Sequence, residues 1–382
     1  MKFEIIKSNR LGIRAALIKR SGFDYIKTPT LALTSVDLGA IERLQKVGLF
    51  KNWLDDIPHR IIEVNERFSQ DRLNGLKQEN DPTKLLELIK PYAEYLDKLI
   101  IFVPILNKGV FVDEKANDIL IETQLQAGYQ NITITDNQLF TPEEFKERLL
   151  HSADLIRKND PFEYGENADI FVLLDIDSPT DILKEKLNIA FEFGVAGIIL
   201  KYAFPKTHFS QYKFIKEFAS KKEIYIHISG VPKTNPYKNY IDKHSLLVLA
   251  LSLSGADSYS IRPQIFISSD SNKTVRLKPT KLFDKDTWGA LPVRSIKGKL
   301  YTFPILNKSD TVREFLNEFH NKSKLIDAIR IYDRLAILLE FSKLRDSVIN
   351  DKFLEFIKQK RYGVSAAEKI FNLNLRNATL PQ

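Results

Sequence analysis

The sequence predicts an α/β protein built as a (β/α)8 TIM barrel, and three observations support this fold class. Eight short apolar segments rich in β-branched residues recur across 28–261, with amphipathic stretches between them. The apolar segments are nearly continuous rather than alternating, which indicates strands buried on both faces. Polar residues follow several segments, as expected where the carboxyl ends of barrel strands converge on one face. A doubly wound open sheet is the alternative arrangement.

Each expected element has its own signal along the chain. The eight expected strands are 28–35, 59–66, 99–106, 131–136, 169–177, 194–202, 223–230 and 255–261. The expected helices between them are 37–52, 82–97, 113–128, 141–158, 180–193, 208–221 and 240–253. Two helices have clear start signals, Asp81-Pro82 in one and Thr141-Pro142 with two glutamates in the other. Proline suits the first helical turn, and acidic side chains there interact favourably with the helix dipole.

The pattern divides the chain into three parts. Residues 1–27 are expected to form an N-terminal β-ribbon, and residues 28–262 the barrel core. Residues 263–382 are expected to hold a basic irregular insertion and C-terminal helices that complete the barrel. Leucines at 335, 338 and 339 give the helical part a packing face.

Composition narrows the class of protein. The chain has 382 residues, of which 43% are hydrophobic and 28% charged, as is typical of a globular protein. No stretch approaches the roughly 20 apolar residues of a membrane helix, so we expect a cytoplasmic protein with no membrane partner. The absence of cysteine excludes disulfides, thiolate nucleophiles and cysteine-ligated zinc. With six scattered histidines we predict no metal ligand and no cofactor, although an all-carboxylate magnesium site stays open.

The net charge of +8 suits a partner that carries phosphates, such as nucleic acid. A lysine-rich solvated surface is the alternative explanation of the same charge. The nucleic-acid-binding residues are predicted in the basic segment after the barrel, at Lys273, Arg276, Lys278 and Lys281.

The usual phosphate-loop and serine-hydrolase motifs are missing. The sequence contains neither GxGxxG nor a Walker A motif, and it has no GxSxG elbow. A Ser-His-Asp triad would need a histidine, and His227 is the only one within an expected strand. Because Ile226 and Ile228 flank it, we interpret His227 as a hydrogen-bonded core histidine.

Carboxylates at strand ends are the strongest candidates for chemistry. Asp136 ends the fourth expected strand, and Asp175 and Asp177 end the fifth. Asp257 lies on or just after the eighth, and Asn65 closes the second. In a barrel these residues face one pocket, where a carboxylate can act as nucleophile, base or ligand acceptor. Capping of the next helix is the alternative for each aspartate alone.

Several segments, taken in order, resemble the tRNA-guanine transglycosylase superfamily, especially its archaeal form. The segments are "FEIIKSNRLGIRAALIKRSGFDYIKTPTLALTS", "IIEVN", "ITDNQ", "DIFVLLDIDSPTD", "HISGVP", "LLVLALSLSGADSYS" and "RIYDRLAILLEFSKLRDSVINDKFLEFIKQ". The chain departs from the family in lacking the three zinc-binding cysteines, and Tyr332 stands where the zinc-binding histidine would be. This zinc-free pattern also resembles the DNA-directed 7-deazaguanine transglycosylases of that superfamily.

The resemblance implies roles for individual residues. Asp257 would be the covalent nucleophile and Asp136 a second catalytic aspartate that contacts the base and handles protons. The substrate-binding residues implied are Asp175, Asn65, Ser258, Ser260 and Gly230. An alternative alignment places Ser260 at the nucleophile's position, which would leave an inactive enzyme.

The function implied is the exchange of guanine for a 7-deazaguanine base in DNA or tRNA through an aspartyl intermediate. A flipped-out nucleotide would be held by the basic surface. A homodimer or a partner protein is a further expectation. Two alternatives stay open: a non-catalytic barrel of the same fold that binds nucleic acid or an active partner subunit, and an unrelated barrel enzyme acting on a small phosphorylated ligand.

Overall fold

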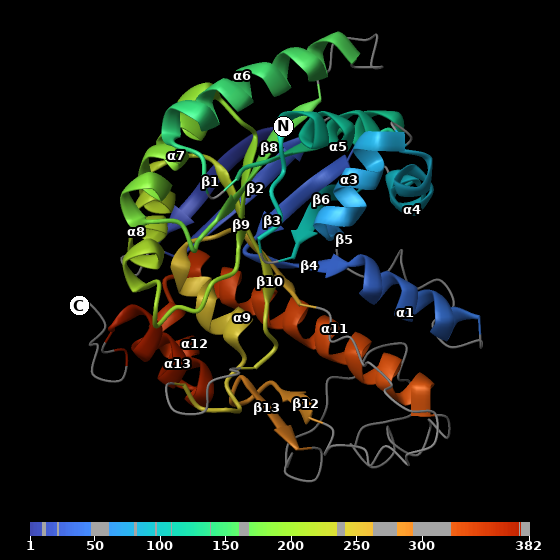
Figure 1. Ribbon diagram of the computed structural model, residues 1–382. Helices are drawn as coiled ribbons and strands as arrows, with labels where there is room; N and C mark the ends of the chain where they lie inside the picture. Colours follow the sequence, from blue (N-terminus) through green and yellow to red (C-terminus); the bar gives the residue numbers. More distant parts are fainter. Residues whose placement is uncertain are drawn as a thin grey trace.

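The computed structural model describes most of the chain and shows a central sheet with helices packed around it (Figure 1). The described residues are 1–9, 13–20, 23–46, 61–79, 82–95, 98–107, 109–137, 139–159, 168–234, 241–262, 281–292, 322–373 and 375. Within these ranges, no helix is both long enough and apolar enough to cross a membrane.

The central sheet confirms the predicted TIM barrel. Its strands are β4 (Thr30–Thr34), β5 (Ile61–Phe68), β6 (Leu99–Leu106), β7 (Asn131–Thr135), β8 (Asp169–Asp175), β9 (Gly197–Lys201), β10 (Tyr225–Val231) and β11 (Ser258–Ile261). They pair in the order β6-β5-β4-β11-β10-β9-β8-β7, and every pair is parallel. Each strand overlaps one of the eight predicted segments, because buried parallel strands leave continuous apolar runs in the sequence.

The helices lie outside the strands, as Figure 1 shows for α5 to α8. Their bounds are α1 (Ser35–Gln45), α3 (Gln70–Glu79), α4 (Thr83–Ala93), α5 (Glu114–Gln126), α6 (Pro142–Asn159), α7 (Thr180–Phe193), α8 (Phe209–Lys221), α9 (Leu247–Ala250) and the 3-10 helix η1 (Leu251–Ser254). The sequence did not predict α3, since Leu73 and Leu76 are its only large apolar residues. The predicted helix 240–253 is reduced to α9 and η1.

The barrel is nearly closed, and side chains from α5 fill the seam between β6 and β7. The amide of Gln124 accepts a hydrogen bond from the Thr133 backbone N–H at 2.8 Å and donates one to the Thr133 carbonyl at 3.1 Å. Asn117 accepts from the Thr135 N–H at 3.2 Å. These amides replace the ladder of a neighbouring strand, so the buried backbone groups of β7 are not left unpaired.

A small antiparallel sheet closes the amino end of the barrel. It comprises β1 (Lys2–Ser8), β2 (Arg14–Arg20) and β3 (Phe23–Thr28). The predicted N-terminal β-ribbon is therefore confirmed, and it has three strands. Ile18 and Ile26 share a buried apolar cluster with barrel residues that include Phe171 and Tyr225. The bottom of the barrel is therefore a packed core.

The chain after the barrel supplies a hairpin and the last helices. The hairpin strands are β12 (Lys281–Asp284) and β13 (Gly289–Pro292), and the helices are α11 (Lys322–Ile349), α12 (Phe353–Lys358) and α13 (Arg361–Phe371). Helix α11 takes the place of the eighth barrel helix, because the Tyr259 ring of β11 stacks on Phe341 with centroids 5.6 Å apart. The predicted C-terminal helices thus complete the barrel.

Candidate active site

A pocket of about 670 Å³ opens at the carboxyl ends of the barrel strands. It lies beside the seam, where β6, β7, β8 and β9 end and their loops begin. Its polar lining consists of Thr135, Asp136, Asn137, Asp175, Asp177, Lys201 and Asn107. Active sites of TIM barrels are built at this face from the loops that follow the strands.

Asp136, directly after β7, forms a buried ion pair in the wall of this pocket. Lys186 of α7 donates to Asp136 Oδ2 at 2.7 Å and to the Asn137 carbonyl at 3.1 Å. Burial raises the pKa of Asp136 to about 6, although the neighbouring Lys186 ammonium opposes the rise. A carboxyl group with this pKa exchanges protons near neutral pH, as an acid or base catalyst requires.

Asp175 ends β8 and forms a second ion pair on the next strand. Lys201 at the end of β9 donates to Asp175 Oδ2 at 3.1 Å, and the two residues are direct partners in the strand register. The Lys201 side chain is 44% exposed, so this pair is open to solvent and to a ligand. Asp177 lies beyond it and meets His208 Nε2 at 3.0 Å.

Several buried polar atoms on β5, on β7 and just after β7 lack a hydrogen-bond partner within the described residues. They are Thr133 Oγ1, Thr135 Oγ1, Asp136 Oδ1, Asn137 Nδ2 and both amide atoms of Asn65. Asp136 and Asn137 are each only 8% exposed. A buried polar atom without a partner is costly, so such atoms usually meet a ligand or a water molecule. Those of Thr135, Asp136 and Asn137 belong to residues that line the pocket.

Part of the pocket lining is apolar and exposed. Leu139 is 80% exposed and Phe111 is 40% exposed, and both line the pocket. The Phe111 ring also packs edge-on against Phe140 with centroids 6.0 Å apart. The pocket therefore offers a hydrogen-bonding wall and an apolar rim to one ligand.

Asp257 lies at the opposite end of the barrel, and the expectation that it lies on or just after the eighth strand and faces the pocket is wrong. The apolar run before it forms α9 and η1, Gly255 ends that run with a left-handed φ of 81°, and β11 begins only at Ser258. Asp257 therefore precedes its strand and lies at the amino end of the barrel.

The contacts of Asp257 are those of a structural residue. Arg14 of β2 binds both of its carboxylate oxygens, with Nε at 3.0 Å from Oδ1. The Thr28 hydroxyl and the Ile226 N–H also donate to it, and the residue is fully buried. Burial raises the pKa of Asp257 and the Arg14 guanidinium opposes the rise. A nucleophile must be reached by its substrate, and this carboxylate is enclosed on every side.

Ser258 belongs to a buried chain of hydrogen bonds across the barrel interior. Its Oγ contacts the Tyr225 hydroxyl and His227 Nδ1, the latter at 2.6 Å. His227 Nε2 lies 2.6 Å from Glu63 Oε2. All four side chains are essentially inaccessible, so His227 is the hydrogen-bonded core histidine that the sequence indicated.

The remaining predicted site residues lie on the barrel strands β10 and β11 and in the segment that follows the barrel. Gly230, at φ 75°, donates its N–H to the buried Ser260 Oγ at 2.8 Å. Lys281 lies on β12 beside Lys233, which donates to its carbonyl at 3.1 Å. Predicted nucleic-acid contacts at Lys273, Arg276 and Lys278 lie outside the described residues.

Sequence reasoning named Asp136 and Asp175, which line the pocket, but missed their partners Lys186 and Lys201. Asn65, on β5, is not among the residues that line the pocket. Lys201 follows the apolar run of β9 just as Asp175 follows that of β8, so the same strand-end signal was available for it. Lys186 lies on the buried face of α7 between Leu183 and Leu187. A lysine within an apolar helix face needs an acidic partner, and this signal could have identified it.

Comparisons with known proteins assign neither a family nor a function to this chain. No family model matches the sequence, and no curated protein matches it. Among solved structures, a mutant tryptophan synthase alpha-subunit from the hyperthermophile Pyrococcus furiosus matches with a TM-score of 0.36 and 14% identity, over 62% of this chain and 87% of that chain. Dihydroorotate dehydrogenase (DHODH) from Eimeria tenella in complex with ferulenol matches with a TM-score of 0.33 and 11% identity, over 46% and 58%. These neighbours are TIM-barrel enzymes with different functions, and no reaction follows for this chain.

Proposed function

We propose that this protein is an enzyme that binds a small polar molecule in the carboxyl-end pocket and moves a proton with Asp136. The observation that carries the proposal is the Asp136 carboxyl itself, with one oxygen on Lys186 and the other without a partner in the described part of the chain. Its pKa of about 6 allows both protonation states near neutral pH.

The other pocket residues have distinct roles in this proposal. The unpartnered Asn137 Nδ2 is a hydrogen-bond donor and the ionised Asp136 Oδ1 is an acceptor, so the ligand needs an acceptor beside an N–H or O–H donor. The Asp175–Lys201 pair supplies a second charged contact. Phe111 and Leu139 would cover an apolar part of the ligand and reduce its contact with water.

A ligand screen by thermal unfolding tests this proposal. The probes are free nucleobases and small amides, added to the unmodified protein and to Asp136→Asn, Asp175→Asn and Asp181→Asn. A ligand at 100 times its Kd stabilises a protein by about 2.7 kcal/mol, and we expect the first two variants to lose this stabilisation. Asp181 is the control, because it is an exposed aspartate on α7. A ligand that stabilises all four proteins equally would contradict the proposal.

Base exchange in nucleic acid is a second candidate, favoured because Asp136 and Asp175 line the same pocket. Since Asp257 lies at the other end, Asp175 would be the attacking carboxylate. Its oxygen would form a bond to C1′ as the bond to guanine breaks, and the leaving base would take a proton from Asp136. A 7-deazaguanine base would then attack C1′ through its ring nitrogen, releasing the Asp175 carboxylate and returning the proton of that nitrogen to Asp136.

Incorporation of labelled guanine into DNA and tRNA separates this candidate from its alternatives. Exchange that is lost in Asp175→Asn and retained in folded Asp257→Asn supports it. Exchange lost only in Asp257→Asn would contradict the assignment of Asp175. Tight, salt-dependent binding of nucleic acid without exchange would instead favour a non-catalytic binding protein.

A further inference from the structure

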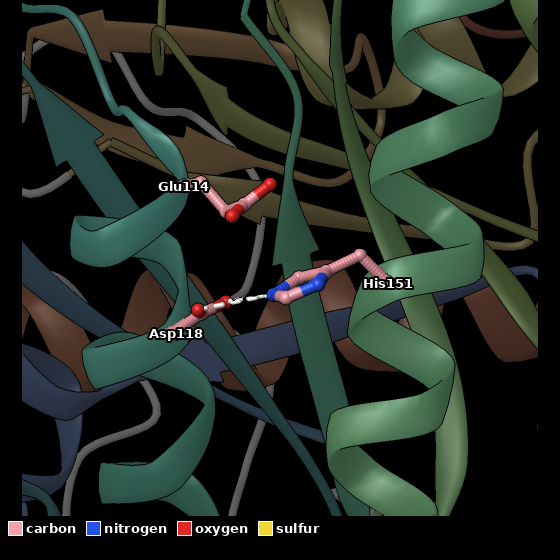
Figure 2. A group of neighbouring side chains, drawn as sticks. All are labelled: Glu114, Asp118 and His151. Atoms are coloured by element: carbon pink, nitrogen blue, oxygen red, sulfur yellow. Dashed lines mark hydrogen bonds and ion pairs between the residues drawn. The ribbon is translucent and has the colours of Figure 1, made fainter.

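Two helices outside the pocket bring three metal-ligand side chains together. Glu114 and Asp118 lie one turn apart on α5, and His151 faces them from α6 (Figure 2). One ligand atom from each residue lies within 4.8 Å of the other two. His151 Nε2 already contacts both oxygens of Asp118, at 3.1 and 3.0 Å.

The two helices hold this arrangement through a buried contact next to it. Asn117 Nδ2 donates to Ser152 Oγ at 3.0 Å, and both residues are buried. These residues precede Asp118 and follow His151 in the sequence, so their hydrogen bond fixes the helix spacing at the cluster. A site whose ligands are held in place loses less conformational freedom when it binds an ion.

We propose that Glu114, Asp118 and His151 form a binding site for a divalent transition-metal ion, with Zn²⁺ as the representative. An imidazole nitrogen with two carboxylates suits Zn²⁺ and its neighbours better than Mg²⁺ or Ca²⁺, which prefer oxygen ligands alone. Metal–ligand bonds of about 2.0–2.2 Å would need the side chains to close in slightly, and the exposed Glu114 and His151 have room to do so. Three protein ligands leave a position for water.

The charges around the cluster favour a cation. Arg148 is attracted by Asp136, which already pairs with Lys186, and by Glu114, Asp118 and Asp113. Asp113 also pairs with Lys77 at 2.7 Å. Before an ion binds, the three carboxylates of Glu114, Asp118 and Asp113 therefore face only two cationic side chains, Arg148 and Lys77. Arg148 turns away toward the pocket, where it donates to the Thr135 carbonyl at 3.3 Å and lies over the Phe140 ring.

Calorimetric titration of the tag-free full chain with zinc chloride tests the site. We expect one saturable site, and we expect His151→Ala and the double variant Glu114→Gln/Asp118→Asn each to weaken it at least about ten-fold, because even outer-shell changes cost that much. His208→Ala is the matched control, since His208 also contacts an aspartate, Asp177, but belongs to no such group of three within the described residues.

The expected and contradicting results can be told apart because Glu114 and His151 are exposed and Asp118 is half-buried, so their replacement leaves the buried core unchanged. Zinc affinity that is unchanged in both cluster variants, or lowered only in His208→Ala, would overturn the proposal. A second titration in excess magnesium chloride tests the ion class. Retained zinc binding supports a nitrogen-containing site, and full displacement by magnesium would contradict it.

Discussion

The two ends of the barrel use buried aspartates in opposite ways. At the amino end, Asp257 accepts four hydrogen bonds, two from the Arg14 guanidinium, one from the Thr28 hydroxyl and one from the Ile226 N–H. At the carboxyl end, Asp136 has Lys186 on one oxygen and no partner on the other within the described residues. The first carboxylate is saturated with contacts, and the second keeps an open hydrogen-bonding position.

The difference teaches how to assign roles to carboxylates that look alike in the sequence. A fully bonded, enclosed carboxylate joins the N-terminal sheet to the barrel and contributes to stability. A carboxylate with an unpartnered atom in a pocket wall has a position where a ligand can bind. Three predictions test this distinction, ordered by their expected effect on the free energy of unfolding.

The largest effect is expected at the amino end. Replacing Asp257 with Ala leaves the Arg14 guanidinium buried without its partner, and such a change costs about 3–5 kcal/mol of stability. Chemical denaturation measures the loss, and Arg14→Ala should give a loss of similar size. A loss below about 1 kcal/mol in both variants would show that the Arg14–Asp257 pair does not hold this end together.

An intermediate, pH-dependent effect is expected for Asp136. Burial raises its pKa from 3.8 to about 6, so folding favours the protonated form. This contribution is fully present below the unfolded-state pKa and is lost as the pH rises through about 6, with a total of at most about 3 kcal/mol. Relative to Asp136→Asn, the unmodified protein should therefore lose stability between about pH 4 and 6. Denaturation curves whose difference is independent of pH would contradict the raised pKa.

The smallest effect on stability is expected at Asp175. Its partner Lys201 is 44% exposed, and solvent screens such pairs to about 0–1 kcal/mol. Asp175→Asn should therefore unfold within about 1 kcal/mol of the unmodified protein while losing ligand binding in the pocket. Denaturation and ligand titration on the same sample measure both. A stability loss as large as that of Asp257→Ala would remove the distinction between the two ends.

Local sequence patterns predicted the fold well because they record burial directly. Strands such as 99–106 are buried on both faces, and their continuous apolar residues indicate this burial in the sequence. The error at Asp257 has a local cause. The run 247–253 is helical, within the predicted helix 240–253, but Gly255 then turns the chain and β11 begins only at Ser258. The predicted strand 255–261 began three residues too early, so Asp257 was assigned to the wrong end of the barrel, because a local pattern locates a strand more reliably than its first residue.

The sequence by itself determined the class of fold, the order of the strands and the gathering of Asp136 and Asp175 at one face, because each depends on patterns within a few residues. Only the tertiary structure decided which carboxylates have all their hydrogen-bonding positions occupied by other residues. Arg14 and Asp257 are 243 residues apart, Lys186 and Asp136 are 50 apart, and Asp118 and His151 are 33 apart. At such separations no local pattern shows which residue pairs with which, since the partners meet only when the barrel closes.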